Sequence, residues 1–334
     1  MNNNGDIFSG VSMEEYILDW FFRERVNLGI NCKSESELTL AWTGGKPHRC
    51  KKAHLFLSHN PVPLFTIKIS RGVVTDSLIS VEKEVLGKLS NLSLPFETPE
   101  LIAEFQVEGV QVLVRSYIPG KSWEILLTKS SGAKRQELAL SLIDYIEPSL
   151  LYMAEQSIEN KDTENTIHSV EVRLKNYIDR HAVHKLDKSK AQEALEIISK
   201  ASWRSPAFGI NDFFAGNILF TVNNRLAVID WEHGSFPGTP MIDAIHISID
   251  LINYLYSVKR PSDRLERRVQ ELIDKVGNAS GVNRDLWGVL SVYSFIEIIS
   301  REREQYGLNP TADIFQELFI SFLRGDKFNA LPRL

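Results

Sequence analysis

The chain has 334 residues, of which 43% are hydrophobic and 24% charged, a composition typical of folded globular proteins and sufficient for one large or two ordinary domains. Its net charge of −5 argues against a protein that binds nucleic acid or anionic membranes through a basic surface. Two cysteines, Cys32 and Cys50, exclude a disulfide framework and a four-thiolate zinc site and favour a reducing, cytoplasmic location. Residues 1–10 show no leader pattern, and no apolar run of about 18 residues predicts a membrane span.

The N-terminal part of the chain has the pattern of a small antiparallel sheet. Residues 12–28 begin with a serine followed by acidic residues and carry apolar side chains at helical spacing, which predicts an amphipathic helix. Apolar and polar residues then alternate in short segments, which predicts strands at 37–42, 54–58, 64–70 and 110–117. A helix is expected to interrupt these strands at residues 77–92.

One predicted strand carries a lysine on its polar face. A lone lysine in this position is most often solvated, so Lys68 alone indicates little. In the following helix, however, Glu82 shares a face with Leu86 and Leu89, and packing of those leucines on the sheet directs its carboxylate toward the strand. We therefore expect an ion pair between Lys68 and Glu82, of the kind that holds an ammonium group against the phosphates of ATP. Glu84 is an alternative partner with a poorer register.

Two further segments are candidates for nucleotide contacts. Gly44 and Gly45, between the first two strands, permit close approach of the backbone to a triphosphate, although a di-glycine hairpin turn is an equally natural interpretation. The strand that contains Val114 and Ser116 occupies the place where kinases offer backbone groups to adenine. That assignment depends on position alone.

Beyond residue 119 the periodicity is mainly helical, with apolar stripes at 138–146 and 269–276. The segment YIPGKSW contains a Pro-Gly turn at this change and is the expected hinge. The fold class predicted is therefore α+β: an antiparallel-sheet lobe over residues 1–118, a larger and mostly helical lobe over residues 119–334, and a cleft between them.

The stretch NDFFAGNILFTVNNRLAVIDWE interrupts the helical part with an apolar hairpin. If Asn223 and Asn224 form a two-residue turn, Asn217 lies opposite Asp230 at the open end of the hairpin. Opposed Cα atoms are about 4.5–5.5 Å apart, so an amide oxygen and a carboxylate converge there. Oxygen ligands of this kind suit Mg²⁺.

An acidic residue five positions before Asn217 completes this pattern. Asp212 is placed to lie beside the metal and orient an attacking hydroxyl. Either aspartate alone is most often a turn or cap residue. The combination of Asp, four residues, Asn, a hairpin and Asp has the spacing of a kinase catalytic loop with its metal-binding Asp, which favours a functional role.

With GINDFFAGNILF, VIDWEHGSFPGTPMIDA, FTIKIS and VEKEVLGKL, the sequence resembles the aminoglycoside phosphotransferase and choline kinase-like family over about residues 35–255. The members are small-molecule kinases with a bilobal protein-kinase-like fold. The resemblance implies ATP and Mg²⁺ as cofactors, a small-molecule hydroxyl as acceptor, and neither nucleic acid nor membrane as partner. By position, it implies a catalytic Asp212, the Mg²⁺ ligands Asn217 and Asp230, the phosphate-binding pair Lys68 and Glu82, and a structural role for Asp243.

The sequence departs from the family pattern next to the catalytic position. Ile210 stands where the family usually has a histidine that supports the loop, and Asn211 replaces the commoner glycine. One alternative function is therefore a catalytically silent, kinase-like nucleotide-binding module. A protein kinase is disfavoured because only twelve residues separate Asp230 from Asp243, too few for an activation segment.

The acceptor and the oligomeric state are not indicated by the sequence. Glu232, Asp243 and Asp250 offer an acidic wall for a cationic amine or sugar, but acids in these positions are equally natural as helix caps or solvated residues. Trp231 invites a cation–π interpretation, although core packing is more common for such an aromatic residue. Sugars, amino alcohols, aminoglycosides and even a protein side chain all stay open as acceptors.

Overall fold

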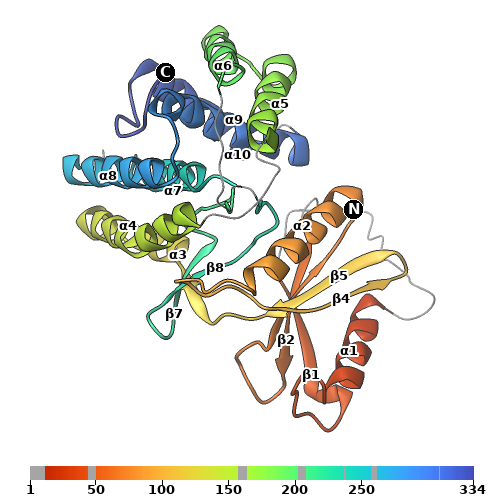
Figure 1. The fold of residues 1–334 in the computed structure, drawn as a ribbon. Coiled ribbons are helices and arrows are strands. Elements are labelled where there is room, and N and C mark those ends of the chain that lie inside the picture. The colour runs from red at the N-terminus through yellow and green to blue at the C-terminus, as the bar shows by residue number, and fades with distance from the viewer. Residues whose placement is uncertain are drawn as a thin grey trace. The chain divides into compact units, whose positions relative to one another are not determined.

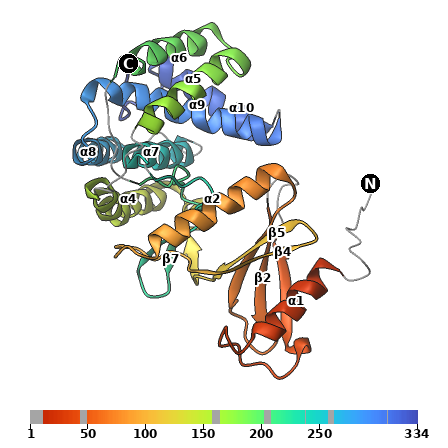
Figure 2. The same cartoon turned by 45° about the vertical axis from the view of Figure 1, so that its right-hand side comes forward.

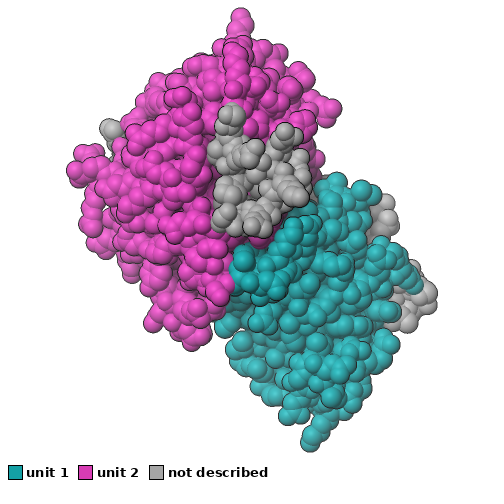
Figure 3. Space-filling view, in the orientation of Figure 1, with its two compact units in different colours: residues 1–92, 98–119 teal, residues 93–97, 120–334 magenta. Residues whose placement is uncertain are grey.

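The structure is a computed structural model, and it describes residues 12–43, 50–156, 164–201, 208–236, 238–256, 262–307 and 309–334. The chain forms two compact units, coloured separately in Figure 3. Unit 1 contains residues 1–92 and 98–119, and unit 2 contains residues 93–97 and 120–334. Gly44 and Gly45 lie outside the described residues. No helix in the described part of the chain is long and apolar enough to cross a membrane.

Unit 1 is built on a five-stranded antiparallel sheet (Figure 1). The strands have the order β1-β2-β3-β5-β4 and comprise β1 (Leu38–Thr43), β2 (Lys51–Leu57), β3 (Phe65–Ile69), β4 (Leu101–Val107) and β5 (Val110–Ser116). The sequence pattern did not predict β4. This strand lies at the sheet edge, is mostly half-buried and has an irregular register between Leu101 and Ala103, so it lacks the alternation that marks a strand with one buried face.

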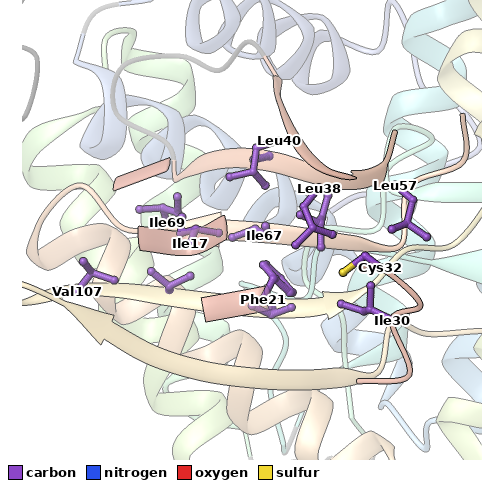
Figure 4. Packing of buried hydrophobic residues seen from close by; sticks show 14 residues of the cluster. Ile17, Phe21, Ile30, Cys32, Leu38, Leu40, Leu57, Ile67, Ile69 and Val107 are labelled. Carbon is purple, nitrogen blue, oxygen red and sulfur yellow. The ribbon is translucent and has the colours of Figure 1, made fainter. Parts of the chain in front are cut away.

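Helices α1 (Met13–Glu24) and α2 (Val73–Leu89) pack on this sheet, and a short 3₁₀ segment, Glu35–Glu37, precedes β1. Ser12 and Glu15 form a capping box at the start of α1. Ile17 and Phe21 of α1 lie among the buried side chains of the sheet (Figure 4). Since side chains alternate along a strand, those of the intervening positions, including Lys68, point to the opposite face, where α2 packs.

Unit 2 contains a small sheet of three strands, β6 (Gly120–Ser122), β7 (Ile218–Thr221) and β8 (Leu226–Val228), paired in that order. Residues 93–97 belong to this unit because Glu97 forms a parallel bridge with Ala227 of β8. The amide of Glu97 donates to Leu226 and its carbonyl accepts from Val228, both at 2.9 Å. A segment that precedes β5 in the chain therefore extends the sheet of unit 2.

The rest of unit 2 is helical. Helices α4, α7 and α8 pack against one another, and α5, α6, α9 and α10 form a second group that α7 contacts through α9 (Figures 1 and 2). The helices are α3 (Trp123–Thr128), α4 (Gly132–Glu155), α5 (Glu164–Arg180), α6 (Lys185–Ile198), α7 (Pro240–Tyr256), α8 (Asp263–Ala279), α9 (Trp287–Tyr306) and α10 (Pro310–Arg324), with a 3₁₀ segment at Arg284–Leu286. An antiparallel-sheet unit and a mostly helical unit confirm the predicted fold class.

Candidate active site

The β7–β8 hairpin has a different register from the predicted one. Ile218 pairs with Val228, and the amide of Thr221 donates to the carbonyl of Arg225 at 3.0 Å, so three residues form the turn instead of two. The last of them, Asn224, has φ +58°. A three-residue connection that ends in the left-handed region is a common hairpin turn, and asparagine tolerates that conformation. The turn residue was recognised correctly, but the turn length was wrong.

In the observed register, the two expected metal ligands, Asn217 and Asp230, are not directly opposite each other. The carbonyl of Asn217 accepts a hydrogen bond from the amide of Ile229 at 2.9 Å, so Asp230 comes one residue after the position facing Asn217. Asp230 has φ +65°, which turns the chain sharply just after the hairpin. Asn217 and Asp230 therefore both lie at the open end of the hairpin, although their predicted pairing was wrong.

Asp212 is held through both of its carboxylate oxygens. Its Oδ1 accepts a hydrogen bond from Nη2 of Arg301 at 2.5 Å, and its Oδ2 accepts one from Nδ2 of Asn217 at 2.7 Å. The same Asn217 nitrogen also donates to the carbonyl oxygen of Asp212 at 3.0 Å. Because the nitrogen of the Asn217 amide faces Asp212, its oxygen is the atom left to bind a hard cation.

The loop that precedes Asp212 is anchored by a residue far along the chain. The buried carboxylate of Asp243, in the first turn of α7, accepts hydrogen bonds from the amides of Ile210 at 2.8 Å and Asn211 at 2.7 Å. Asn211 has φ +56°, and its side chain donates to the carbonyl of His233 and to Oγ of Ser235. Asparagine thus supplies both the left-handed backbone and two hydrogen bonds that glycine lacks. Asp243 braces this loop rather than merely capping its own helix.

Two glycines allow the chain to cross itself beside this loop. Gly209 and Ser235 exchange backbone hydrogen bonds of 3.1 and 2.9 Å. A Cβ atom on Gly238 would lie 2.0 Å from the amide nitrogen of Gly209, so no other residue fits at position 238 without displacing the backbone.

The titratable groups around Asp212 respond mainly to burial. Burial opposes ionisation of Asp212, but the nearby Arg301 guanidinium outweighs it and holds the pKa of Asp212 below its usual range. Burial raises the pKa of Asp243 to about 7, and it raises the pKa of Asp250, which accepts the amide of Ala215, to about 7 as well. Because the side chains of Asp243 and Asp250 are buried, they do not form the exposed acidic wall considered from the sequence.

Trp231 is a core residue. It is fully buried, donates its indole N–H to the carbonyl of Val228 at 3.1 Å and stacks on Phe96 at 6.2 Å. It offers no exposed ring face to a cationic ligand.

In unit 1, the structure brings Lys68 and Glu82 together. Nζ of Lys68 lies 2.5 Å from Oε2 of Glu82, and both side chains are fully buried. The other oxygen of Glu82 accepts a hydrogen bond from Nη1 of Arg115, a residue of β5 that sequence reasoning missed. Two cations therefore share one carboxylate. Glu84, the alternative partner, is exposed and pairs with Lys88 instead.

Val114 and Ser116 lie in β5, between β3 and β4. The amide of Ser116 already donates to the carbonyl of Glu100 at 2.9 Å, and the amide of Tyr117 donates to that of Leu64 at 3.3 Å. These two donors are therefore used within unit 1. Adenine contacts through Val114 and Ser116 stay a prediction, and the geometry does not add to it.

An antiparallel-sheet unit, a helical unit and an Asp–Asn pair before a hairpin that ends at an aspartate are the features of kinase-like phosphotransferases. A model of the phosphotransferase enzyme family matches residues 65–271, more than half of the chain, and the chain belongs to that family. The resemblance stated from the sequence is thereby confirmed.

Among solved structures, the chain is similar to the gentamicin complex of APH(2")-IIa. The TM-score is 0.51 and the sequence identity 16%, over 92% of this chain and 97% of that chain. At this identity, the similarity establishes the fold alone. No curated protein shows a significant match to the sequence.

Two arginines are the main additions of the structure to the predicted site. Arg115 could have been suspected, since a charged residue inside the apolar strand VQVLVRS needs a buried partner. Arg301 carries a weaker signal: it lies in the helical sequence EIISRERE, where its partner Asp212 is 89 positions away. No local periodicity indicates a contact at that distance.

Proposed function

We propose that this phosphotransferase moves the γ-phosphoryl group of MgATP to a hydroxyl group of a small molecule. The observation that carries the proposal is the hydrogen bond between Asp212 and Asn217 in a loop that leads directly into the β7–β8 hairpin and Asp230. This arrangement matches the base, the metal ligand and the second metal ligand of kinase catalytic loops.

In this proposal, Asp212 receives the acceptor hydroxyl. Its carboxylate is ionised at neutral pH because its pKa is lowered, and it is already oriented by Arg301 and Asn217. A weakly basic carboxylate is suited to orienting the hydroxyl and taking its proton late, as expected for a loose phosphoryl-transfer transition state.

The residues expected to hold Mg²⁺ are Asn217 and Asp230. An amide oxygen and a carboxylate form a donor set that fits a hard divalent cation and does not fit a soft metal. When bound, Mg²⁺ neutralises negative charge on the phosphate oxygens. Lys68, which forms an ion pair with Glu82, contributes a cation for the phosphates of the nucleotide.

The acceptor class is supported by family membership and by the gentamicin-bound relative in fold, which together favour a small molecule over a protein. Amino alcohols, sugars and aminoglycosides all carry a hydroxyl group, which is the one group that the proposed reaction requires at Asp212.

The test is ADP formation by the purified protein with MgATP and a panel of hydroxylated amines, amino alcohols, sugars and aminoglycosides. Acceptor-dependent ADP release supports the proposal. Stabilisation by MgATP without turnover on any acceptor would favour the catalytically silent nucleotide-binding module, since ligand binding alone raises Tm.

Asp212→Asn should lower kcat by about 10²–10⁴-fold, the usual contribution of a positioned base, while the shift in Tm on addition of MgATP is retained. The matched control is Asp179→Asn, which removes an exposed carboxylate from α5 of the same unit and should leave kcat unchanged. Full turnover by Asp212→Asn would refute the assignment of this residue.

A further inference from the structure

Arg301 reaches two neighbouring groups of the catalytic loop from helix α9. Its Nη1 donates to the carbonyl of Asn211 at 3.1 Å, and its Nη2 donates to Oδ1 of Asp212 at 2.5 Å. The guanidinium group is planar, so two nitrogens at a fixed separation determine the position of a peptide and of a carboxylate together. A lysine has a single nitrogen and lacks this geometry.

Arg301 is itself held in place. Its side chain is only 9% exposed, and Oε1 of Glu297, one helical turn earlier, lies 3.9 Å from Nη1. Helix α9 packs on α5, α6, α7 and α10, which makes it a rigid support. A side chain on a packed helix positions a partner more accurately than one on a loop.

The catalytic loop needs such a support because Ile210 replaces the histidine that usually supports this loop in the family, and isoleucine cannot do so. Ile210 is fully buried, and its aliphatic side chain forms no hydrogen bonds; its amide donates to Asp243. Asp243 thus fixes the donors of the loop from α7, whereas Arg301 fixes an acceptor of the loop and the Asp212 carboxylate from α9. The two residues bind complementary groups of the same peptide segment.

We propose that Arg301 is a positioning residue for Asp212, and that it provides from α9 the loop support that Ile210 cannot give. The proposal rests on the phosphotransfer function proposed above. Arg301 does not touch the acceptor; with Asn217 on the other oxygen, it fixes the rotation of the Asp212 carboxylate toward the hydroxyl. Each carboxylate oxygen has two acceptor positions, of which Arg301 and Asn217 take one each.

The test compares kcat and the KM for MgATP in Arg301→Gln and Arg301→Lys. A misplaced catalytic group typically costs about 10²-fold, so Arg301→Gln should lower kcat by about 10–100-fold while KM changes by less than about threefold. The kcat of Arg301→Lys, which keeps the charge but has a single donor nitrogen, should fall between that of Arg301→Gln and that of the wild type. A rise in the KM for MgATP with no change in kcat would overturn the proposal.

The matched control is Arg303→Gln, in the same helix. Arg303 is equally buried, donates to the carbonyl of His181 and lies 4.0 Å from Asp313, and among the described residues it makes no hydrogen bond or ion pair with the loop of Asp212. This variant should retain the wild-type kcat. An equal loss of kcat in both variants means that α9 acts only through general stability, and the positioning role is then wrong.

A double variant distinguishes positioning from independent effects. If Arg301 acts through Asp212, then Asp212→Asn combined with Arg301→Gln turns over no more slowly than Asp212→Asn alone. If the fold losses in kcat of the two single variants multiply in the double variant, the proposal is contradicted. If Arg301→Gln does not fold, the same comparison is made with Arg301→Lys.

Thermal unfolding separates this inference from the proposed function. The wild type, the two single variants and the double variant form a cycle that also gives a coupling in Tm. The decrease in Tm of the double variant should be smaller than the sum of the decreases of the two single variants, whether or not the enzyme turns over. No turnover by the wild type overturns the phosphotransfer function, and the positioning role with it. Additive losses in Tm overturn the pairing of Arg301 with Asp212 itself.

Discussion

Two carboxylates in the described part of the chain, Glu82 and Asp212, each bind two donors. Glu82 serves both Lys68 and Arg115, and Asp212 serves both Arg301 and an amide donor. A buried carboxylate with a single partner leaves lone pairs unsatisfied, whereas two donors on opposite oxygens satisfy and orient it. The consequence is that removing one donor disturbs the partner that stays.

At Glu82, we predict that Arg115→Met weakens MgATP binding and destabilises unit 1. Without Arg115, Glu82 draws on the Lys68 ammonium alone, and less positive charge is left for phosphates. The KM for MgATP should rise by a factor of about 3–10, and breaking a buried pair should cost about 3–5 kcal/mol. Kinetics and denaturant unfolding measure the two effects.

The control for this variant is Lys88→Met in α2, which removes the exposed partner of Glu84. Surface pairs at this spacing contribute only about 0.3–0.5 kcal/mol. An equal destabilisation by both variants would show that the buried triad has no special role.

His246 is a buried histidine whose surroundings disfavour its protonated form. The ring is fully buried on α7, stacks on Phe214, and neither nitrogen has a hydrogen-bond partner among the described residues. Burial lowers its pKa from 6.5 to about 4, against the attraction of Glu297 and Asp212 and with the help of Arg301 and His233. The unfolded chain therefore binds the proton more readily than the native one between those pH values.

This linkage predicts that the contribution of His246 to stability is complete above pH 6.5 and is lost as the pH falls toward 4, by up to ~3 kcal/mol. His246→Phe, which keeps a ring against Phe214, should remove this part of the pH dependence. Denaturant unfolding at a series of pH values tests it. His168→Phe, at an exposed position, should leave the wild-type acid dependence intact, and an unchanged slope in His246→Phe would contradict the prediction.

At the scale of elements, the chain crosses itself at Gly209 and Gly238, directly before the loop of Asp212. We predict that Gly238→Ala destabilises the protein by at least about 2 kcal/mol and lowers kcat, because a Cβ atom 2.0 Å from a backbone nitrogen forces the two segments apart. Thermal unfolding and the ADP assay measure both effects.

Gly87→Ala is the matched control for this substitution. Gly87 lies within α2, and nothing lies within 4 Å of the added Cβ, so the same chemical change should stabilise by about 0.5–1 kcal/mol. The free energy of unfolding should therefore fall in Gly238→Ala and rise in Gly87→Ala. A tolerated Gly238→Ala would mean that the crossing is looser than the backbone distances indicate.

Elements with strong periodicity were predictable from the sequence. The helix expected at 12–28 is α1, and the one expected at 77–92 is α2, four residues earlier at its start. The small sheet of unit 2 was predicted only in part: its hairpin was recognised, but the turn length was wrong and β6 was not seen, because three-residue strands carry too little pattern.

The candidate site was predictable where it depends on a linear motif, as with Asp212 and Asn217, and where a helix face directs a side chain, as with Glu82. Arg301 and Arg115 were not, because each reaches a partner that only the tertiary fold brings near. Adenine contacts by Val114 and Ser116 stay a prediction, since backbone contacts leave no trace in residue identity.

At the scale of the whole molecule, the two units have separate cores that single substitutions can address. Phe96 is buried in unit 2 against Trp231, and Phe105 packs in unit 1 against Trp20. We predict that Phe96→Ala, at a cost of about 3–5 kcal/mol, increases hydrogen exchange of the amides in β8.

Phe105→Ala is the comparison and should increase exchange in β4 and β5 instead. Although Phe96 and Phe105 are close in sequence, their effects should appear in different units. Exchange that rises in β4 after Phe96→Ala would show that residues 93–97 belong energetically to unit 1.

The bridge between Glu97 and Ala227 has a consequence for how the polypeptide is made and divided. Residues 93–97 leave the ribosome long before residues 226–228 are synthesised. The sheet edge that they complete can therefore form only after most of the chain has been made. A fragment that begins at residue 120 lacks this segment and exposes the backbone of β8 as a pairing edge for other chains. A hybrid protein that takes the larger unit from one family member therefore has to take residues 93–97 from the same member, since a single cut between residues 119 and 120 divides a sheet.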